Sequence, residues 1–270
     1  MRCPLPLPAP VFAPVVLLAL TATLGAQSPA VPPDTAALRT ITARGRILAA
    51  YDQAAWHGTD AVMARLPNPA GIEGFLATQD AGGKWHVLFG RLDATAETLL
   101  VAARADQATR PDSFLVTLSP NPVAGTDAER RAFLALKTAG TDLASAPPPF
   151  RGTYNSYALP APDGSWLVFF LPGQTQPDLY PHGGDFRYEV SVDGRRILSK
   201  FQMHRSVLMS RVPAEAVAGA HTVITADLPQ ESDVFLVLSR SPRKPELIAT
   251  DHYNFEIHED GTITWRYGKR

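Results

Sequence analysis

The chain has almost no cysteine: among its 270 residues only Cys3 carries a thiol. Cys3 precedes the first apolar run, so we expect it to be removed with a cleaved leader. The mature chain then has no thiol. That absence excludes a disulfide framework, a cysteine nucleophile and a zinc–thiolate site.

The sequence also lacks a long hydrophobic run. The uncharged, mostly apolar stretch Val11–Leu24 has 14 residues, whereas a membrane-spanning helix needs about 20. With Arg2 before it and the small residues Gly25 and Ala26 after it, this stretch is typical of an export signal over residues 1–26, cleaved after Ala26. A membrane anchor is the alternative interpretation. We therefore expect a periplasmic or secreted protein with no transmembrane span after signal removal.

The sequence also has no large excess of charge of either sign, since it contains 25 basic and 26 acidic side chains. This balance gives no reason to expect a nucleic-acid partner. With 45% apolar and 19% charged residues, the composition is typical of a globular protein. The proline-containing residues 27–33 are expected to form a flexible lead-in.

Residues 34–146 show the pattern of an α+β domain. The apolar spacing predicts a helix that Asp34 caps and that ends near Gly58, with a second short helix beginning at Thr59. Residues 71–92 alternate on both sides of a glycine-containing turn, which indicates a hairpin, and two more strands are expected over 98–105 and 113–118. Thr126 and Glu129 form a capping box for a helix that we expect to end at Gly140.

Three consecutive prolines, residues 147–149, predict a linker, because proline joins neither a helix interior nor a sheet ladder. Beyond it, residues 150–270 are expected to form a β-rich domain, with a short helix over 213–218. The predicted strands are Tyr154–Leu159, Ser165–Leu171, Asp185–Val192, Arg195–Met203, His221–Leu228, Val234–Arg240, Glu246–Ile257 and Thr262–Tyr267. The predicted fold class is α+β, with N-terminal helices and a small antiparallel sheet, then a mostly antiparallel half arranged as a sandwich or open barrel.

Two hairpins in this half allow their strand register to be predicted, because a slip by one residue moves every apolar side chain to the other face. A two-residue turn at residues 193–194 pairs Phe186 with Phe201 on the apolar face. A three-residue loop ending at Gly261 pairs Phe255 with Trp265. Both registers leave most histidines of these hairpins on the polar, solvent-facing side.

The first hairpin also carries the candidate catalytic residues His182, Asp185 and His204. Its register makes Asp185 and His204 diagonal neighbours, and such a carboxylate can hold an imidazole in one tautomer for general-base chemistry. The alternative is an ordinary polar pair on a solvated sheet face. A hydrolase that uses these residues requires the three side chains to converge with a fourth polar group in a concave pocket.

No metal ion or cofactor is expected from the sequence, because the seven histidines contain no pair at ligand spacing. The basic residues Arg187, Arg196 and Lys200 are candidate binding residues for an acidic envelope polymer or another protein. The leading prediction is an exported binding or envelope-associated protein that acts through a sheet surface of its second half. The alternative is an exported hydrolase that uses a His/Asp set around residues 182–204.

Overall fold

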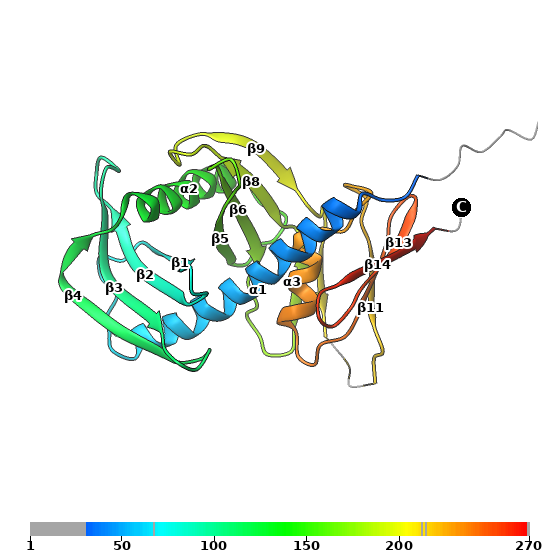
Figure 1. Ribbon diagram of the computed structural model, residues 1–270, viewed down its shortest axis with the longest axis horizontal. Helices are drawn as coiled ribbons and strands as arrows, with labels where there is room; N and C mark the ends of the chain where they lie inside the picture. Colours follow the sequence, from blue (N-terminus) through cyan, green and yellow to red (C-terminus); the bar gives the residue numbers. More distant parts are fainter. Residues whose placement is uncertain (1–30, 67, 212, 214, 269–270) are drawn as a thin grey trace, which may run out of the picture. The chain divides into compact units, whose positions relative to one another are not determined.

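The computed structural model describes residues 31–66, 68–211, 213 and 215–268 (Figure 1). The predicted export signal, with Cys3 and the cleavage position, lies outside these residues. Within the described ranges the chain forms three helices and fourteen strands, and antiparallel pairs dominate the sheets. The mixed α+β class is confirmed, whereas the sandwich or open barrel is not. None of the helices in the described part is both long enough and apolar enough to cross a membrane.

The strands form four sheets joined by three helices. The helices are α1 Thr35–Met63, α2 Asp127–Ala144 and α3 Glu231–Ser239. The first sheet has the order β1-β2-β3-β4, with β1 Gly74–Gln79, β2 Trp85–Leu92, β3 Leu99–Gln107 and β4 Phe114–Ala124. The second has the order β5-β6-β8-β9, with β5 Tyr154–Pro160, β6 Trp166–Pro172, β8 Phe186–Val190 and β9 Ile197–Gln202.

The two remaining sheets are smaller. One pairs β7 Tyr180–Gly183 with β10 Val207–Ser210, and neither strand was predicted. The other has the order β11-β12-β13-β14, with β11 Gly219–Thr222, β12 Glu246–Ala249, β13 Tyr253–Ile257 and β14 Ile263–Tyr267. Strands β11 and β12 are parallel. The single strand predicted over 246–257 is interrupted at residues 250–252, and the described part of 213–218 forms a turn rather than a helix.

Helix α1 begins as predicted, since the Asp34 carboxylate accepts hydrogen bonds from the backbone N–H groups of Ala36 and Ala37. The predicted end at Gly58 is wrong, and the helix continues through Thr59 to Met63. A Cβ atom on Gly58 would lie 2.8 Å from Cγ2 of Val87 in β2. This glycine therefore allows close packing of α1 on the first sheet and does not terminate the helix.

Helix α2 has the predicted capping box, in which Thr126 and Glu129 satisfy each other's backbone N–H groups. It continues past Gly140 to Ala144. All three hydrophobic clusters of the described residues combine residues from before and after the proline run; Tyr51 of α1 and Phe169 of β6, for example, belong to the same cluster. The division of the chain at residues 147–149 stays a prediction.

Helix α3 replaces the predicted strand Val234–Arg240, which is wrong. The run is apolar on every side, with Val234 and Val237 completely buried, so its sequence has no helical or strand period. Helix α3 packs against α1 (Figure 1). Gly45 of α1 permits this contact, because a Cβ atom there would lie 2.5 Å from Cβ of Val234.

The two hairpins differ in how well their register was predicted. In β13–β14 the pairing of Phe255 with Trp265 is confirmed, and Gly261 at the end of the loop has a positive φ of 83°. In β8–β9 the register shifts next to the turn, so Phe186 pairs with Gln202 instead of Phe201. The extra residue is Leu198, which forms a β-bulge and is half exposed.

Candidate metal centre

Three histidines and one aspartate converge from four separate elements. His182 lies in β7, His204 follows β9, His221 lies in β11, and Asp233 belongs to the first turn of α3. One potential ligand atom from each lies within 4.8 Å of the corresponding atoms of the others. These four residues are called the HHHD cluster below.

Four of the six distances between ligand atoms in the HHHD cluster are close to the edges of a small tetrahedron. Oδ1 of Asp233 lies 3.0 Å from Nε2 of His182, 3.2 Å from Nε2 of His204 and 3.1 Å from Nε2 of His221. The Nε2 atoms of His182 and His221 are 3.4 Å apart. Ligands about 2.0–2.1 Å from a tetrahedral zinc ion are separated by about 3.3–3.4 Å. These four distances approach those of a four-coordinate metal site, and all four ligand atoms lie within 4.8 Å of one another.

One ligand atom is unsatisfied by the protein itself. Nε2 of His204 is buried and makes no hydrogen bond within the described chain. Its 3.2 Å contact with Oδ1 of Asp233 is an ion-pair distance without hydrogen-bond geometry. A buried nitrogen that has an ion-pair contact but no well-directed hydrogen bond is incompletely satisfied, which is costly. A metal ion at the centre of the cluster would remove that cost.

The helix start fixes the carboxylate of Asp233. Asp233 is the third residue of α3, and its Oδ2 atom accepts a 2.7 Å hydrogen bond from the backbone N–H of Gln230. Its Oδ1 atom is left to face the three imidazoles, and the side chain is completely buried. The capping interaction thus presents a single oxygen to the centre, as a monodentate metal ligand requires.

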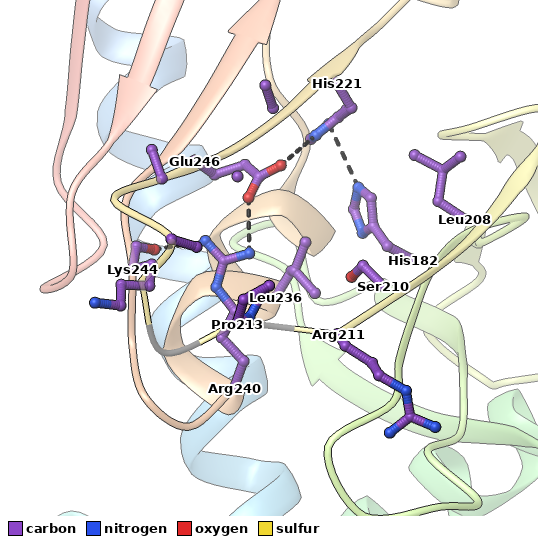
Figure 2. Close-up of a pocket in the computed structure, with 14 residues that line it drawn as sticks. His182, Leu208, Ser210, Arg211, Pro213, His221, Leu236, Arg240, Lys244 and Glu246 are labelled. Atoms are coloured by element: carbon purple, nitrogen blue, oxygen red, sulfur yellow. Dashed lines mark hydrogen bonds and ion pairs between the residues drawn. The ribbon is translucent and has the colours of Figure 1, made fainter.

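A second layer of carboxylates orients two of the imidazoles. Oδ1 of Asp185 lies 3.0 Å from Nδ1 of His204, and Oε1 of Glu246 lies 2.9 Å from Nδ1 of His221. Glu246 is itself held by Arg240 at 2.7 Å (Figure 2). When each Nδ1–H donates to its carboxylate, Nε2 keeps its lone pair toward the centre. Metal-binding histidines in proteins usually have such partners.

The carboxylates also determine the charge state of the cluster. Burial lowers the pKa of His204, but Asp233 and Asp185 outweigh it and raise the pKa to about 10. Burial likewise lowers the pKa of His221, and Asp233 and Glu246 raise it to about 9 overall. Burial opposes ionisation of Asp233, yet the three imidazoles hold its pKa well below the ordinary value. In the metal-free chain Asp233 is therefore an ionised carboxylate and the imidazoles of His204 and His221 are protonated at neutral pH. A metal ion that binds here would displace the proton from each of these two Nε2 atoms.

The structure brings together the three candidate catalytic residues of the sequence analysis. The rings of His182 and His204 have centroids 4.7 Å apart, and the predicted contact between Asp185 and His204 is present. The expectation that they face solvent is wrong, since His182, Asp185 and His204 are 6%, 1% and 7% exposed. Elements later in the chain, α3 and β11, supply the groups that cover them.

His221 and Asp233 were missed because no local motif connects them. The four ligand residues are at least 12 positions apart in sequence, so ligand spacing predicted no metal site. One signal was present for Asp233. It follows Gln230 by three residues at the start of an apolar run, which resembles a helix capping box. Nothing local distinguishes His221.

The candidate binding residues Arg187, Arg196 and Lys200 do not form one surface. Arg187 contacts the buried carboxylate of Glu231 at 2.7 Å, and Lys200 contacts Asp142 at 2.6 Å. Lys200 pairs with Tyr188, so it lies on the opposite face of the sheet from Arg187. Arg196 is exposed beside the β8–β9 turn. Two of the three charges are thus neutralised within the protein.

Comparisons of the chain with protein-family models, with curated proteins and with solved structures found no match. The chemistry of the HHHD cluster is therefore argued from its own donor atoms. Three imidazole nitrogens and one carboxylate oxygen suit zinc and its neighbours in the first transition series. Calcium and magnesium prefer sites made of oxygen atoms.

Proposed function

We propose that this protein binds one zinc ion through His182, His204, His221 and Asp233. The observation that carries the proposal is the approach of three imidazole Nε2 atoms to one carboxylate oxygen at 3.0–3.2 Å in a buried space. The carboxylates of Asp185 and Glu246 add the outer partners that such a centre needs.

A hydrolytic role is the second candidate function. Its requirement was that His182, Asp185 and His204 converge with a fourth polar group in one concave pocket. The two histidines contact Asp233 and line a small hollow, whereas Asp185 contacts His204 but does not line the hollow. Binding through the sheet surface of the second half, to an acidic polymer or a protein, stays a prediction. So does export to the periplasm or beyond, which depends on residues 1–26.

The test is metal analysis of the full chain. The protein is stripped with a chelator, titrated with zinc against a chromophoric competitor, and analysed by elemental mass spectrometry. We expect one zinc per chain, and loss of that zinc in His221→Ala. His252→Ala is the matched control, because His252 also pairs with a carboxylate, Asp227, but at an exposed position.

Two outcomes contradict the proposal. One is a wild-type protein that retains no more zinc than His221→Ala. The other is equal zinc loss in His252→Ala, which would mean that the binding is distributed over surface histidines. Competition with copper, nickel and manganese in the same assay identifies the preferred ion.

A further inference from the structure

A groove of about 670 Å³ lies beside helix α1, on residues that the zinc proposal does not use. Its walls come from α1, β5, the segment between β6 and β7, and α3. Two of the lining residues are acidic, Asp52 and Asp60, and among the described residues no lysine, arginine or histidine lines the groove. The groove therefore carries negative charge that no basic residue in its walls offsets.

Asp52 is a partly buried carboxylate without a basic partner. Its Oδ1 atom accepts a 2.7 Å hydrogen bond from the Tyr157 hydroxyl and lies 3.5 Å from Nδ2 of Asn155, and both partners are neutral. The fully buried carboxylates all have a basic partner: Asp185, Glu231, Asp233 and Glu246. Burial raises the pKa of Asp52 despite its two hydrogen bonds. A cation bound beside it would offset this cost of burial.

The second oxygen of Asp52 is available to a ligand. Oδ2 accepts no hydrogen bond from a described residue. Within the described chain the buried side-chain atoms that lack a hydrogen bond belong to Arg131, His204 and Arg240, so Oδ2 of Asp52 is not one of them. It is therefore accessible to solvent, on a residue that lines the groove. An ammonium or other N–H donor in the groove has an acceptor there.

An exposed aromatic ring lies between the two acidic residues along α1. Asp52, Trp56 and Asp60 are four residues apart, so they are neighbours on one side of the helix, at steps of about 6 Å along its axis. Trp56 lines the groove and is 57% exposed, although His57 stacks on it with ring centroids 4.9 Å apart. An indole ring attracts cations and also packs against alkyl chains. The helix thus presents a carboxylate, an aromatic ring and a second carboxylate in a row.

We propose that the groove binds a linear organic polycation, a di- or polyamine. One ammonium group donates to Oδ2 of Asp52, the alkyl chain lies over Trp56, and a second ammonium group lies near Asp60. A neutral ligand such as an oligosaccharide would leave both carboxylates without a counter-charge. The inference is independent of the zinc proposal, because no ligand residue of the HHHD cluster lines this groove.

The test is isothermal titration calorimetry of the full chain with spermidine, a linear triamine, at physiological salt. We expect one saturable site per chain. Asp52→Asn removes the charge and keeps the shape of the side chain, and is expected to weaken spermidine binding at least tenfold. Trp56→Ala changes an exposed side chain and is expected to weaken binding about three- to fivefold. Thermal unfolding of each variant confirms that it is folded.

Asp112→Asn is the matched control, because it removes the same charge from an exposed residue outside the groove, where Asp112 pairs with Arg110. It is expected to leave spermidine binding unchanged, and the neutral trisaccharide maltotriose is expected not to bind. A wild type that shows no saturable spermidine binding would overturn the proposal. So would unchanged affinity in Asp52→Asn or Trp56→Ala, equal weakening by Asp112→Asn, or binding of maltotriose as tight as that of spermidine.

Discussion

Two histidines in this molecule each lie between two aspartates, one on the surface and the other in a buried space. His86 in β2 lies 2.7 Å from Asp106 and 3.3 Å from Asp80, and the three side chains are 33–43% exposed. His204 lies 3.0 Å from Asp185 and 3.2 Å from Asp233, with at most 8% of any side chain exposed. A carboxylate on each ring nitrogen is therefore not by itself the mark of a site.

The difference lies in what else reaches the carboxylate. Asp233 is shared by three imidazoles from three elements, whereas Asp80 and Asp106 serve one histidine on a sheet surface. Convergence of several donors in a buried space permits a metal to replace their mutual contacts. An exposed histidine–carboxylate pair would bind a metal ion little better than water does. The predictions below test this contrast, from the largest expected effect to the smallest.

Removal of the metal is expected to have the largest effect on stability. A ligand present at about a thousand times its dissociation constant stabilises the folded state by about 4 kcal/mol. For a chain of this size that corresponds to a loss of roughly 8–16 °C in melting temperature when a chelator is added. Calorimetry with and without chelator measures the shift. The melting temperature of His86→Ala should fall on addition of chelator by as much as that of the wild type, and the melting temperature of His204→Ala should not change. A wild type whose melting temperature is unaffected by chelator would contradict the proposed difference between the two histidines.

The packing of α3 on α1 is expected to stabilise the HHHD cluster, and not the exposed group formed by His86 and its two aspartates. Gly45→Ala forces Cβ against Val234, next to Asp233, and should cost about 1–3 kcal/mol of unfolding free energy. The same change at Gly140 in α2 meets only Phe170 at 3.7 Å. It should stabilise the protein by about 0.5–1 kcal/mol, because glycine is unfavourable within a helix.

Urea unfolding of the two glycine variants gives the comparison, and zinc titration gives a second readout. Gly45→Ala is expected to weaken zinc binding as well, while Gly140→Ala leaves it unchanged. Equal stability of the two variants would contradict the close contact between α1 and α3.

The outer carboxylate of His204 is expected to affect metal affinity without abolishing it. Asp185→Asn keeps an acceptor for Nδ1 but removes the charge, and changes of this kind reduce affinity about 10- to 100-fold. The matched change at the surface histidine, Asp106→Asn, should leave zinc affinity as it is. Competition titration measures the zinc affinity of both variants. An unchanged zinc affinity in Asp185→Asn would show that Asp185 does not contribute to metal binding.

The surface histidine should give the smallest effect, seen only in the pH dependence of stability. The hydrogen bond to Asp106 raises the pKa of His86 above its ordinary value, against an opposing effect of burial. The folded state therefore binds the proton more tightly than the unfolded state. Its contribution to stability is complete below the unfolded pKa, about 6.5, and is lost as the pH rises through the higher folded value.

The comparison for this effect is wild type against His86→Gln by urea unfolding at several pH values. The difference in unfolding free energy should be below about 1 kcal/mol, largest in acid and reduced by salt. If the difference in unfolding free energy grew as the pH rose, the folded state would instead be stabilised by the neutral form of His86.

The sequence predicted best where a local rule decides the structure. The β13–β14 register followed from Gly261, and the start of α2 followed from Thr126 and Glu129. Prediction failed where distant contacts decide. The apolar run around Val234 has no period of its own and becomes helical by packing on Gly45. The bulge at Leu198 moved one register by a residue.

The HHHD cluster was the least predictable part, for the same reason. His182, Asp185 and His204 were recognisable because they lie within one stretch of chain. His221 and Asp233 become their neighbours only through the placement of β11 and α3. A site whose ligands each come from a different element has no signature in the spacing of its residues.

That arrangement has a consequence for how the protein withstands its surroundings. A metal held by His182 and Asp233 would tie together segments 51 positions apart, in a chain whose only thiol is at Cys3. Proteins outside the cytoplasm commonly obtain such cross-links from disulfide bonds. Here a metal cross-link would not be broken by reductants but would be lost to a competing zinc ligand. The availability of zinc, rather than redox conditions, would therefore determine the stability of the fold.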